Sequence, residues 1–162
     1  MKSRTPQRTH GRNVRRVSPR AMRGSTAVEF ALVFPLFFVI MYAIVTFSLI
    51  FVAQQNLTLA AEEGARAALN WQSSTSLQNA LDNRGQAACT AATQMATAFV
   101  ARAMTCTPTS APCGNGMQCI NVALSYNYSS NPFVPSLPIM NVALPATLQS
   151  NATVQLNPEN VQ

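Results

Sequence analysis

The sequence predicts an α+β protein in which a long N-terminal transmembrane helix continues outside the membrane and is followed by a small helical plus antiparallel-sheet ectodomain. Three observations support this fold class. Residues 30–53 form an uncharged and almost wholly apolar stretch of 24 residues. A helical period of small and apolar residues follows it to about residue 70. Farther on, apolar and polar residues alternate over 118–128, as they do in a strand with one buried face.

The positive charge of the chain is concentrated at its start. Eight of the 11 Lys and Arg residues lie in residues 1–26, which contain no acid, whereas residues 27–162 hold three Arg against five acids. The net charge of +6 and the pI near 9.8 therefore describe a basic leader and not a basic domain. We accordingly predict no nucleic-acid partner.

Residues 30–53 predict a single membrane-spanning helix. At about 1.5 Å per residue the helix is about 36 Å long, enough to cross about 30 Å of hydrocarbon. A secretory signal has a shorter apolar region of about 7–15 residues. A buried helix of a soluble protein is the alternative, but Thr46 and Ser48 are the only polar residues in the stretch and leave no solvent face. The preceding positive charges predict a cytoplasmic N-terminus and an exported C-terminal part.

Pro35 lies inside this span. Proline removes one backbone hydrogen bond and bends many helices. Two interpretations stay open. One is a harmless kink near one end of the span, which membrane helices tolerate when neighbours satisfy the freed carbonyl. The other is a bend or locally melted turn that is used in packing against other helices.

The residues just before the span form the most informative motif. A carboxylate at Glu29 is disfavoured at the bilayer edge unless it is solvated or paired. One interpretation is that the carboxylate lies among the lipid headgroups and interacts favourably with the helix dipole. However, the order Gly24, Ser25, three further residues, Glu29 and Phe30 resembles the processing site of type IV prepilins and pseudopilins. The resemblance implies that a prepilin peptidase cuts after Gly24, so that Ser25 becomes the first residue and Glu29 the fifth.

Such processing changes the charge near the membrane. It removes all eight leader charges and creates an ammonium group at Ser25. The resemblance implies that Glu29 meets the N-terminal amine of a neighbouring subunit. This pairing offsets the unfavourable free energy of leaving either charge in a medium of low dielectric constant.

Residues 54–71 predict that the helix continues beyond the membrane. Glu62 and Arg66 are an i,i+4 pair in the favourable order. A glycine inside a helix costs up to about 1 kcal/mol relative to alanine, so Gly64 indicates a packing requirement. The small residues of this segment allow close approach of another helix; they are Ala61, Gly64, Ala65 and Ala68.

Residues 23–70 together resemble the N-terminal module of the TadE-like family. The residues that carry the resemblance are Gly24, Val28, Glu29, Phe30, Pro35, Gln55, Gly64, Ala65 and Arg66. The resemblance implies a minor pseudopilin that assembles or primes a Flp-type, tight-adherence pilus from the bacterial inner membrane. The implied partners are the prepilin peptidase, another pseudopilin (TadF-like or TadG-like), the major Flp pilin and the inner-membrane platform proteins. TadG-like chains usually carry a much larger ectodomain, so the length argues against that member.

The sequence divides into a basic cytoplasmic leader (1–24), the transmembrane and extended helix (25–72) and an exported domain (73–162). Within the last part, residues 75–104 read as a second helix in which Gly85 marks a possible break. Residues 105–116 are turn-rich and predict a loop. Strands are expected at 118–128, 139–144 and 152–156, which form an antiparallel sheet of about three strands.

The four cysteines all lie on the predicted exported side: Cys89, Cys106, Cys113 and Cys119. An even number in an oxidising compartment favours two disulfides, worth roughly 2–4 kcal/mol each. If residues 89–106 were one straight helix, Cys89 and Cys106 would be about 25 Å apart and unable to bond. That condition leaves the pairs 89–113 with 106–119, or 89–119 with 106–113. Metal binding is disfavoured because the sequence lacks a C-x₂-C pair and this domain lacks His.

We recognise no catalytic constellation in the sequence, which predicts a protein that is not an enzyme and that uses no metal or cofactor. The alternative function is that of an uncleaved, single-pass membrane-anchored ectodomain that binds a periplasmic or surface ligand. Processing after Gly24 discriminates between the two. The sequence leaves open whether the protein enters the fibre or stays at its base.

Overall fold

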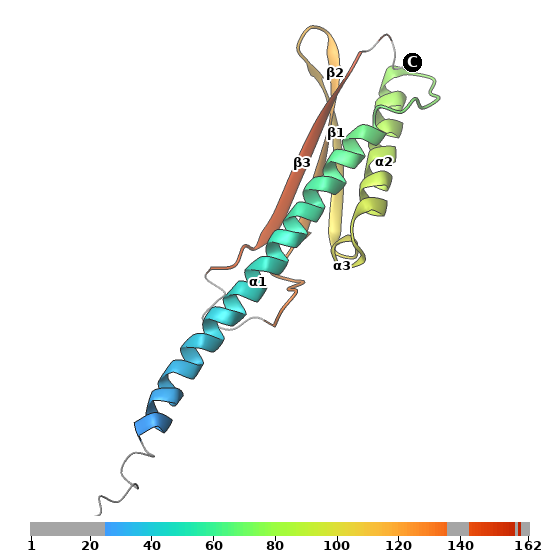
Figure 1. Cartoon of the computed structure of the whole chain (residues 1–162). Helices are drawn as coiled ribbons and strands as arrows, with labels where there is room; N and C mark the ends of the chain where they lie inside the picture. The colour runs from blue at the N-terminus through green and yellow to red at the C-terminus, as the bar shows by residue number, and fades with distance from the viewer. Residues whose placement is uncertain (1–24, 136–142, 158, 160–162) are drawn as a thin grey trace, which may run out of the picture. The chain divides into compact units, whose positions relative to one another are not determined.

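The computed structural model describes residues 25–135, 143–157 and 159 (Figure 1). The elements in chain order are helices α1 (Ser25–Ala67), α2 (Leu77–Met95) and α3 (Ala98–Ala101), then strands β1 (Met104–Cys113), β2 (Met117–Asn127) and β3 (Thr147–Leu156). This arrangement confirms the α+β class. The chain separates into two compact units between Met41 and Tyr42, and α1 runs from one into the other. The predicted divisions at residues 24 and 72 stay predictions.

The first unit contributes the apolar N-terminal part of α1. Its large side chains are exposed on all sides of the helix, with Phe30, Leu32 and Phe37 each more than 60% exposed. The helix continues through Pro35. A helix that is apolar all round suits an apolar environment, and α1 is the one helix among the described residues that is long and apolar enough to cross a membrane.

The second unit contains a three-stranded antiparallel sheet in the order β1-β2-β3. The strands β1 and β2 form a hairpin through Gly114, Asn115 and Gly116, whose φ values of 38°, 55° and 75° all lie in the left-handed region. Glycine and asparagine adopt this conformation most readily. The tight turn brings Cys113 opposite Met117 and sets the register of the hairpin.

The predicted loop over 105–116 is wrong, because most of it forms β1. Pro108 and Pro112 suggested turns, but β1 is an edge strand, where a residue without an N–H donor is tolerated. The predicted strand at 118–128 corresponds to β2, and that at 152–156 to the second half of β3. The predicted strand at 139–144 lies mostly outside the described residues, and its last two residues are not in a strand.

The predicted helix over 75–104 is shorter and breaks at a different place. Ser76 caps the start of α2 by accepting a hydrogen bond from the Asn79 N–H at 3.3 Å. The helix ends at Met95, and Asn56 of α1 accepts hydrogen bonds at 3.0 and 3.1 Å from the N–H and hydroxyl of Thr97. The break therefore lies next to an asparagine from another helix. Gly85 stays helical; a Cβ there would lie 3.0 Å from Pro108 of β1.

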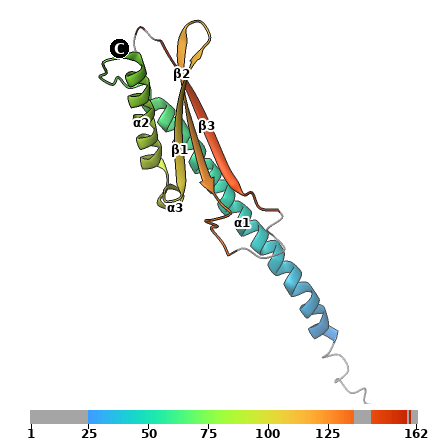
Figure 2. The same cartoon turned by 180° about the vertical axis from the view of Figure 1, so that it is seen from behind.

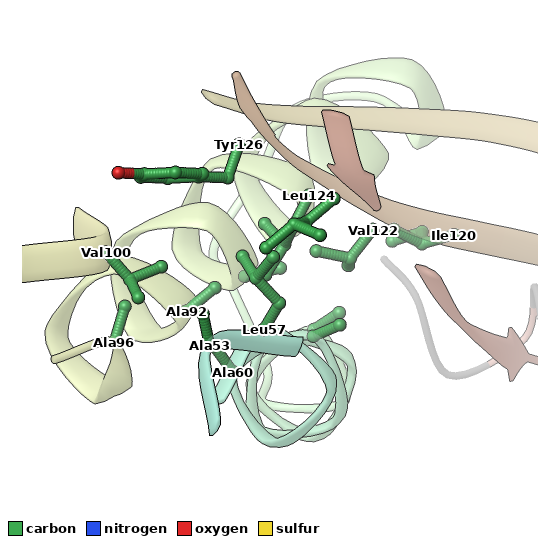
Figure 3. Close-up of a cluster of buried hydrophobic side chains, with 14 of the residues drawn as sticks. Ala53, Leu57, Ala60, Ala92, Ala96, Val100, Ile120, Val122, Leu124 and Tyr126 are labelled. Atoms are coloured by element: carbon green, nitrogen blue, oxygen red, sulfur yellow. The ribbon is translucent and has the colours of Figure 1, made fainter. Parts of the chain in front are cut away.

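The core of the second unit lies between the helices and the inner face of the sheet (Figure 3). Alternate residues of β2 point into it, from Ile120 to Tyr126, and each is at most 1% exposed. Leu57 of α1 meets them from the helical side (Figure 3). Otherwise the helices contribute mainly buried alanines: Ala53, Ala60, Ala61, Ala80, Ala88 and Ala92. Their small side chains allow the helices to lie close together.

The closest of these approaches is at Gly64. A Cβ added there would lie 2.8 Å from the Ala88 carbonyl oxygen, 3.2 Å from the Ala92 side chain and 3.3 Å from Val122. The first contact is with backbone, which cannot turn aside as a flexible side chain can. Gly64 is thus the point at which α1, α2 and β2 meet.

Two disulfides are present, and they confirm the expected oxidised cysteines. Cys89 of α2 is joined to Cys106 of β1, and Cys113 is joined to Cys119 across the hairpin. Both pairings that a straight helix would leave, 89–113 with 106–119 and 89–119 with 106–113, are wrong, because the chain between Cys89 and Cys106 is not one straight helix. The chain turns after Met95 and returns as β1 beside α2, which brings the two Cα atoms to 5.7 Å (Figure 2).

We predict that Gly64→Ala destabilises the second unit. Overpacking a close contact costs about 1–3 kcal/mol, which exceeds the gain of at most about 1 kcal/mol in helix propensity. Thermal unfolding of the disulfide-bonded protein in detergent, followed by circular dichroism, measures the change. Glu62→Ala on the exposed side of α1 is the matched control and is expected to change stability by less than about 0.5 kcal/mol. A G64A protein as stable as this control would contradict the close-packing interpretation.

We predict that the two disulfides contribute different amounts to the free energy of unfolding. In the chain-entropy account, the bond with a sequence separation of 17 contributes about 3 kcal/mol and that with a separation of 6 about 2 kcal/mol. Replacing the Cys89–Cys106 pair by serines should therefore lower the free energy of unfolding more than replacing Cys113–Cys119. Denaturant unfolding of the two double variants tests the order, and non-reducing peptide mapping of the wild type checks the pairing.

Candidate functional site

The predicted processing motif lies at the start of α1. Gly24 lies outside the described residues, and Ser25 is the first residue of α1. Glu29 is exposed on the helix, and within the described part of the chain its carboxylate forms no ion pair or hydrogen bond. Phe30 is 67% exposed and its ring stacks on Phe34, with centroids 5.4 Å apart. The carboxylate is therefore accessible to another molecule.

Of the predicted packing residues, Pro35 lies in the first unit, and the other four lie in the last two turns of α1. Ala61, Gly64 and Ala65 are buried, and at Gly64 the neighbouring helix is α2 of the same chain. Arg66 is exposed, and its guanidinium lies 3.7 Å from the carboxylate of Glu63. The predicted Glu62 partner is thus replaced by the i,i+3 neighbour. An exposed pair of this kind contributes at most about 1 kcal/mol.

Sequence reasoning did not identify Arg84, whose side chain binds the backbone at the C-terminal end of α1. Arg84 of α2 is 2% exposed, and its Nη1 donates to the carbonyl oxygens of Ala68 and Leu69, both at 3.2 Å. Ala68 and Leu69 form the turn that directly follows α1, where the carbonyls of the chain no longer have a helical partner. A cation placed there also interacts favourably with the helix dipole. The C-terminal end of α1 is therefore stabilised by a charge from α2.

A signal for this contact is present in the sequence. Arg84 lies four residues after Ala80, three after Leu81 and four before Ala88, so it shares the apolar face of α2. An arginine on such a face is buried together with its neighbours unless it bends out to solvent. A buried guanidinium requires several acceptors, and the terminal carbonyls of a helix supply them.

The remaining chemistry of the described residues is that of packing and cross-linking. No group of three His, Cys, Asp or Glu side chains comes together within this part of the chain. Each of the four cysteines is in a disulfide. Burial raises the pKa of the Tyr126 hydroxyl, and the nearby charge of Arg102 offsets part of this rise.

These features define a class of protein. In this class a disulfide-bonded α+β unit is built on an N-terminal helix, and the helix is long and apolar enough to anchor the unit to a membrane by a single pass. A family model described as TadE-like protein matches residues 24–66. The match confirms the predicted resemblance over the segment that carries its motif. No curated protein and no solved structure matches the chain.

We predict that Arg84→Met lowers the stability of the second unit by about 2–3 kcal/mol. The substitution keeps the length of the side chain but removes charged hydrogen bonds to buried carbonyls. Arg66→Met is the matched control, because that guanidinium is exposed and loses only its surface pair with Glu63, and it should change stability by at most about 1 kcal/mol. Denaturant unfolding of both variants provides the comparison. Equal effects at the two positions would show that α1 does not depend on this cap.

Proposed function

We propose that the protein is a minor pseudopilin that acts in the assembly or priming of a Flp-type pilus. The observation that carries the proposal is the family match, which begins at Gly24, the residue before the proposed cut, and ends at Arg66. A prepilin peptidase removes residues 1–24 on the cytoplasmic side. The mature chain then begins at Ser25 and stays anchored in the inner membrane by α1.

The charge distribution supports this orientation. The residues before the apolar stretch hold eight cations, and only Glu62, Glu63 and Arg66 are charged in the twenty residues after it. The leader is thus a topology signal as well as the segment that the peptidase removes. The C-terminal unit lies on the periplasmic side, where its two disulfides are stable.

In this proposal Glu29 pairs with the amine of Ser25 on a neighbouring subunit. Its carboxylate is exposed and precedes 24 uncharged residues. An opposite charge from another chain strongly stabilises the ionised form of a carboxylate in that position. The partners are a second pseudopilin, the major Flp pilin and the inner-membrane platform proteins. The role is one of binding and assembly, without an enzymatic activity of its own.

The proposal predicts cleavage at one bond. Co-expression with a prepilin peptidase should produce a chain that begins at Ser25, as measured by intact mass and N-terminal sequencing of the membrane-extracted protein. Gly24→Ala should block this cleavage, because a side chain at that position hinders entry of the backbone into a narrow active site. Gly11→Ala, which changes a leader glycine away from the cut, should be processed normally. An intact Met1 start in every sample would leave the alternative, an uncleaved anchored ectodomain.

The proposal also predicts separate roles for Gly24 and Glu29. Glu29→Gln should leave cleavage intact but lower the yield of partner pseudopilin recovered with the protein, because a neutral amide does not attract the ammonium of a neighbour. Glu62→Gln, an exposed acid farther along α1, is the control and should not alter recovery. Unchanged recovery with E29Q would argue against the intersubunit pair.

A further inference from the structure

The free part of α1 is too short to span a bilayer. The uncharged stretch begins at Phe30, and from Tyr42 onward the helix belongs to the second compact unit. The intervening 12 residues rise about 18 Å, and even the 17 residues from Ser25 rise only about 26 Å, against about 30 Å of hydrocarbon. Tilt increases the deficit. If α1 spans the membrane, as proposed above, about eight residues of the packed stretch lie in hydrocarbon when the count starts at Phe30.

Other parts of the second unit reach this level of α1. The Tyr42 hydroxyl donates to the Pro135 carbonyl oxygen. One turn on, Thr46 is 1% exposed, and Ile50 is 7% exposed. Pro135, which follows β2, therefore contacts α1 nearer to the N-terminus of the helix than β3 does. The Gln149 carbonyl of β3 accepts a hydrogen bond from Gln54, 12 residues farther along α1, at 2.7 Å (Figure 1).

This end of the unit has the composition of a bilayer interface. Tyr42 is half-buried here, and tyrosines are enriched where hydrocarbon meets headgroups. Tyr126 and Tyr128 are buried and support Phe133 from within, with ring centroids 5.2 and 5.3 Å from its ring. Residues 103–158 contain no charge. The adjacent cation is exposed Arg102, whose charge acts on the Tyr126 hydroxyl, and arginine is favoured near lipid phosphates.

The opposite side of α1 over the same turns is also apolar. Ile44, Val45 and Leu49 are 62%, 48% and 37% exposed, although the other face of these turns is covered by the protein. In water these side chains would form an unfavourable apolar surface. Within the outer leaflet they contact acyl chains. Both faces of the helix are thus accounted for by the same position in the membrane.

We propose that this end of the second unit is immersed in the outer leaflet, with Phe133, Val134 and Pro135 among the lipid headgroups and upper acyl chains. In this position the second unit contacts the membrane directly and is not held above it by α1. The contact with Tyr42 forms at the level of the bilayer interface, where Arg102 is placed to bind lipid phosphate. This inference rests on the proposed span of α1.

Tryptophan fluorescence in vesicles tests the depth directly. The chain has one tryptophan, Trp71, beyond the far end of α1 and 65% exposed. In Trp71→Phe/Val134→Trp, we expect blue-shifted emission that is quenched by phosphatidylcholine brominated high on the acyl chain. Native Trp71 is the control and should be quenched by aqueous acrylamide instead. Acrylamide quenching of the introduced indole without bromolipid quenching would overturn the proposal. So would shielding of that indole from both quenchers that depends on protein density, because a second copy would then cover the site.

A measurement on the unchanged full-length protein guards against a misfolded variant. In nanodiscs, a carbene probe dissolved in the bilayer should label residues 30–41, the outward face of 44–49 and residues 133–135, and should leave 149–155 of β3 unlabelled. Labelling of 30–41 and of the outward face of 44–49, with residues 133–135 unlabelled, would retain the span and overturn the immersion. Absence of label from 30–41 would contradict the span itself, so the two failures are distinguishable.

Discussion

The close approach of α1 and α2 at Gly64 is the contact on which the second unit depends. Gly64 lies so near the Ala88 carbonyl that no side chain fits between them. The alanine-rich faces on either side follow from this constraint, because larger residues would hold the helices apart. The same approach brings Val122 of β2 within reach of both helices. A sheet of only three strands can then cover a compact helical layer.

Small apolar side chains remove little surface from water, so a core of this kind gains little hydrophobic stabilisation per residue. Specific polar and covalent contacts supply the rest. Arg84 ties the end of α1 to α2, Asn56 ties α1 to the turn after α2, and Cys89 ties α2 to β1. Each joins two elements that are separate in the sequence. These contacts therefore join the helices and the sheet to one another, in addition to the packing of the buried side chains.

The elements with a strong local pattern could be predicted from the sequence, namely the long helix and the alternating strand β2. β1 could not, because Pro108 and Pro112 carry the same local signal in an edge strand as in a loop. The end of α2 could not either, since it is fixed by Asn56, 41 residues before Thr97. At the candidate site, the motif of Gly24 and Glu29 could be predicted because its residues are close together in the sequence. The partner of Arg84 depends on tertiary structure.

Hydropathy gives the number of apolar residues in α1 but not what surrounds them. Residues that contact lipid and residues that lie in a protein core are both apolar, so the 24 uncharged residues include residues of both kinds. In the structure the kinds overlap between Tyr42 and Ala53, where Thr46, Ile50 and Ala53 face the protein while Val45 and Leu49 face outward. A stretch longer than the bilayer requires is therefore expected wherever a domain packs onto its own anchor. Here the stretch of 24 residues exceeds a span of about 20 residues by only about four. The second unit nevertheless packs along the last 12 of them, from Tyr42 to Ala53, which agrees with the immersion proposed above.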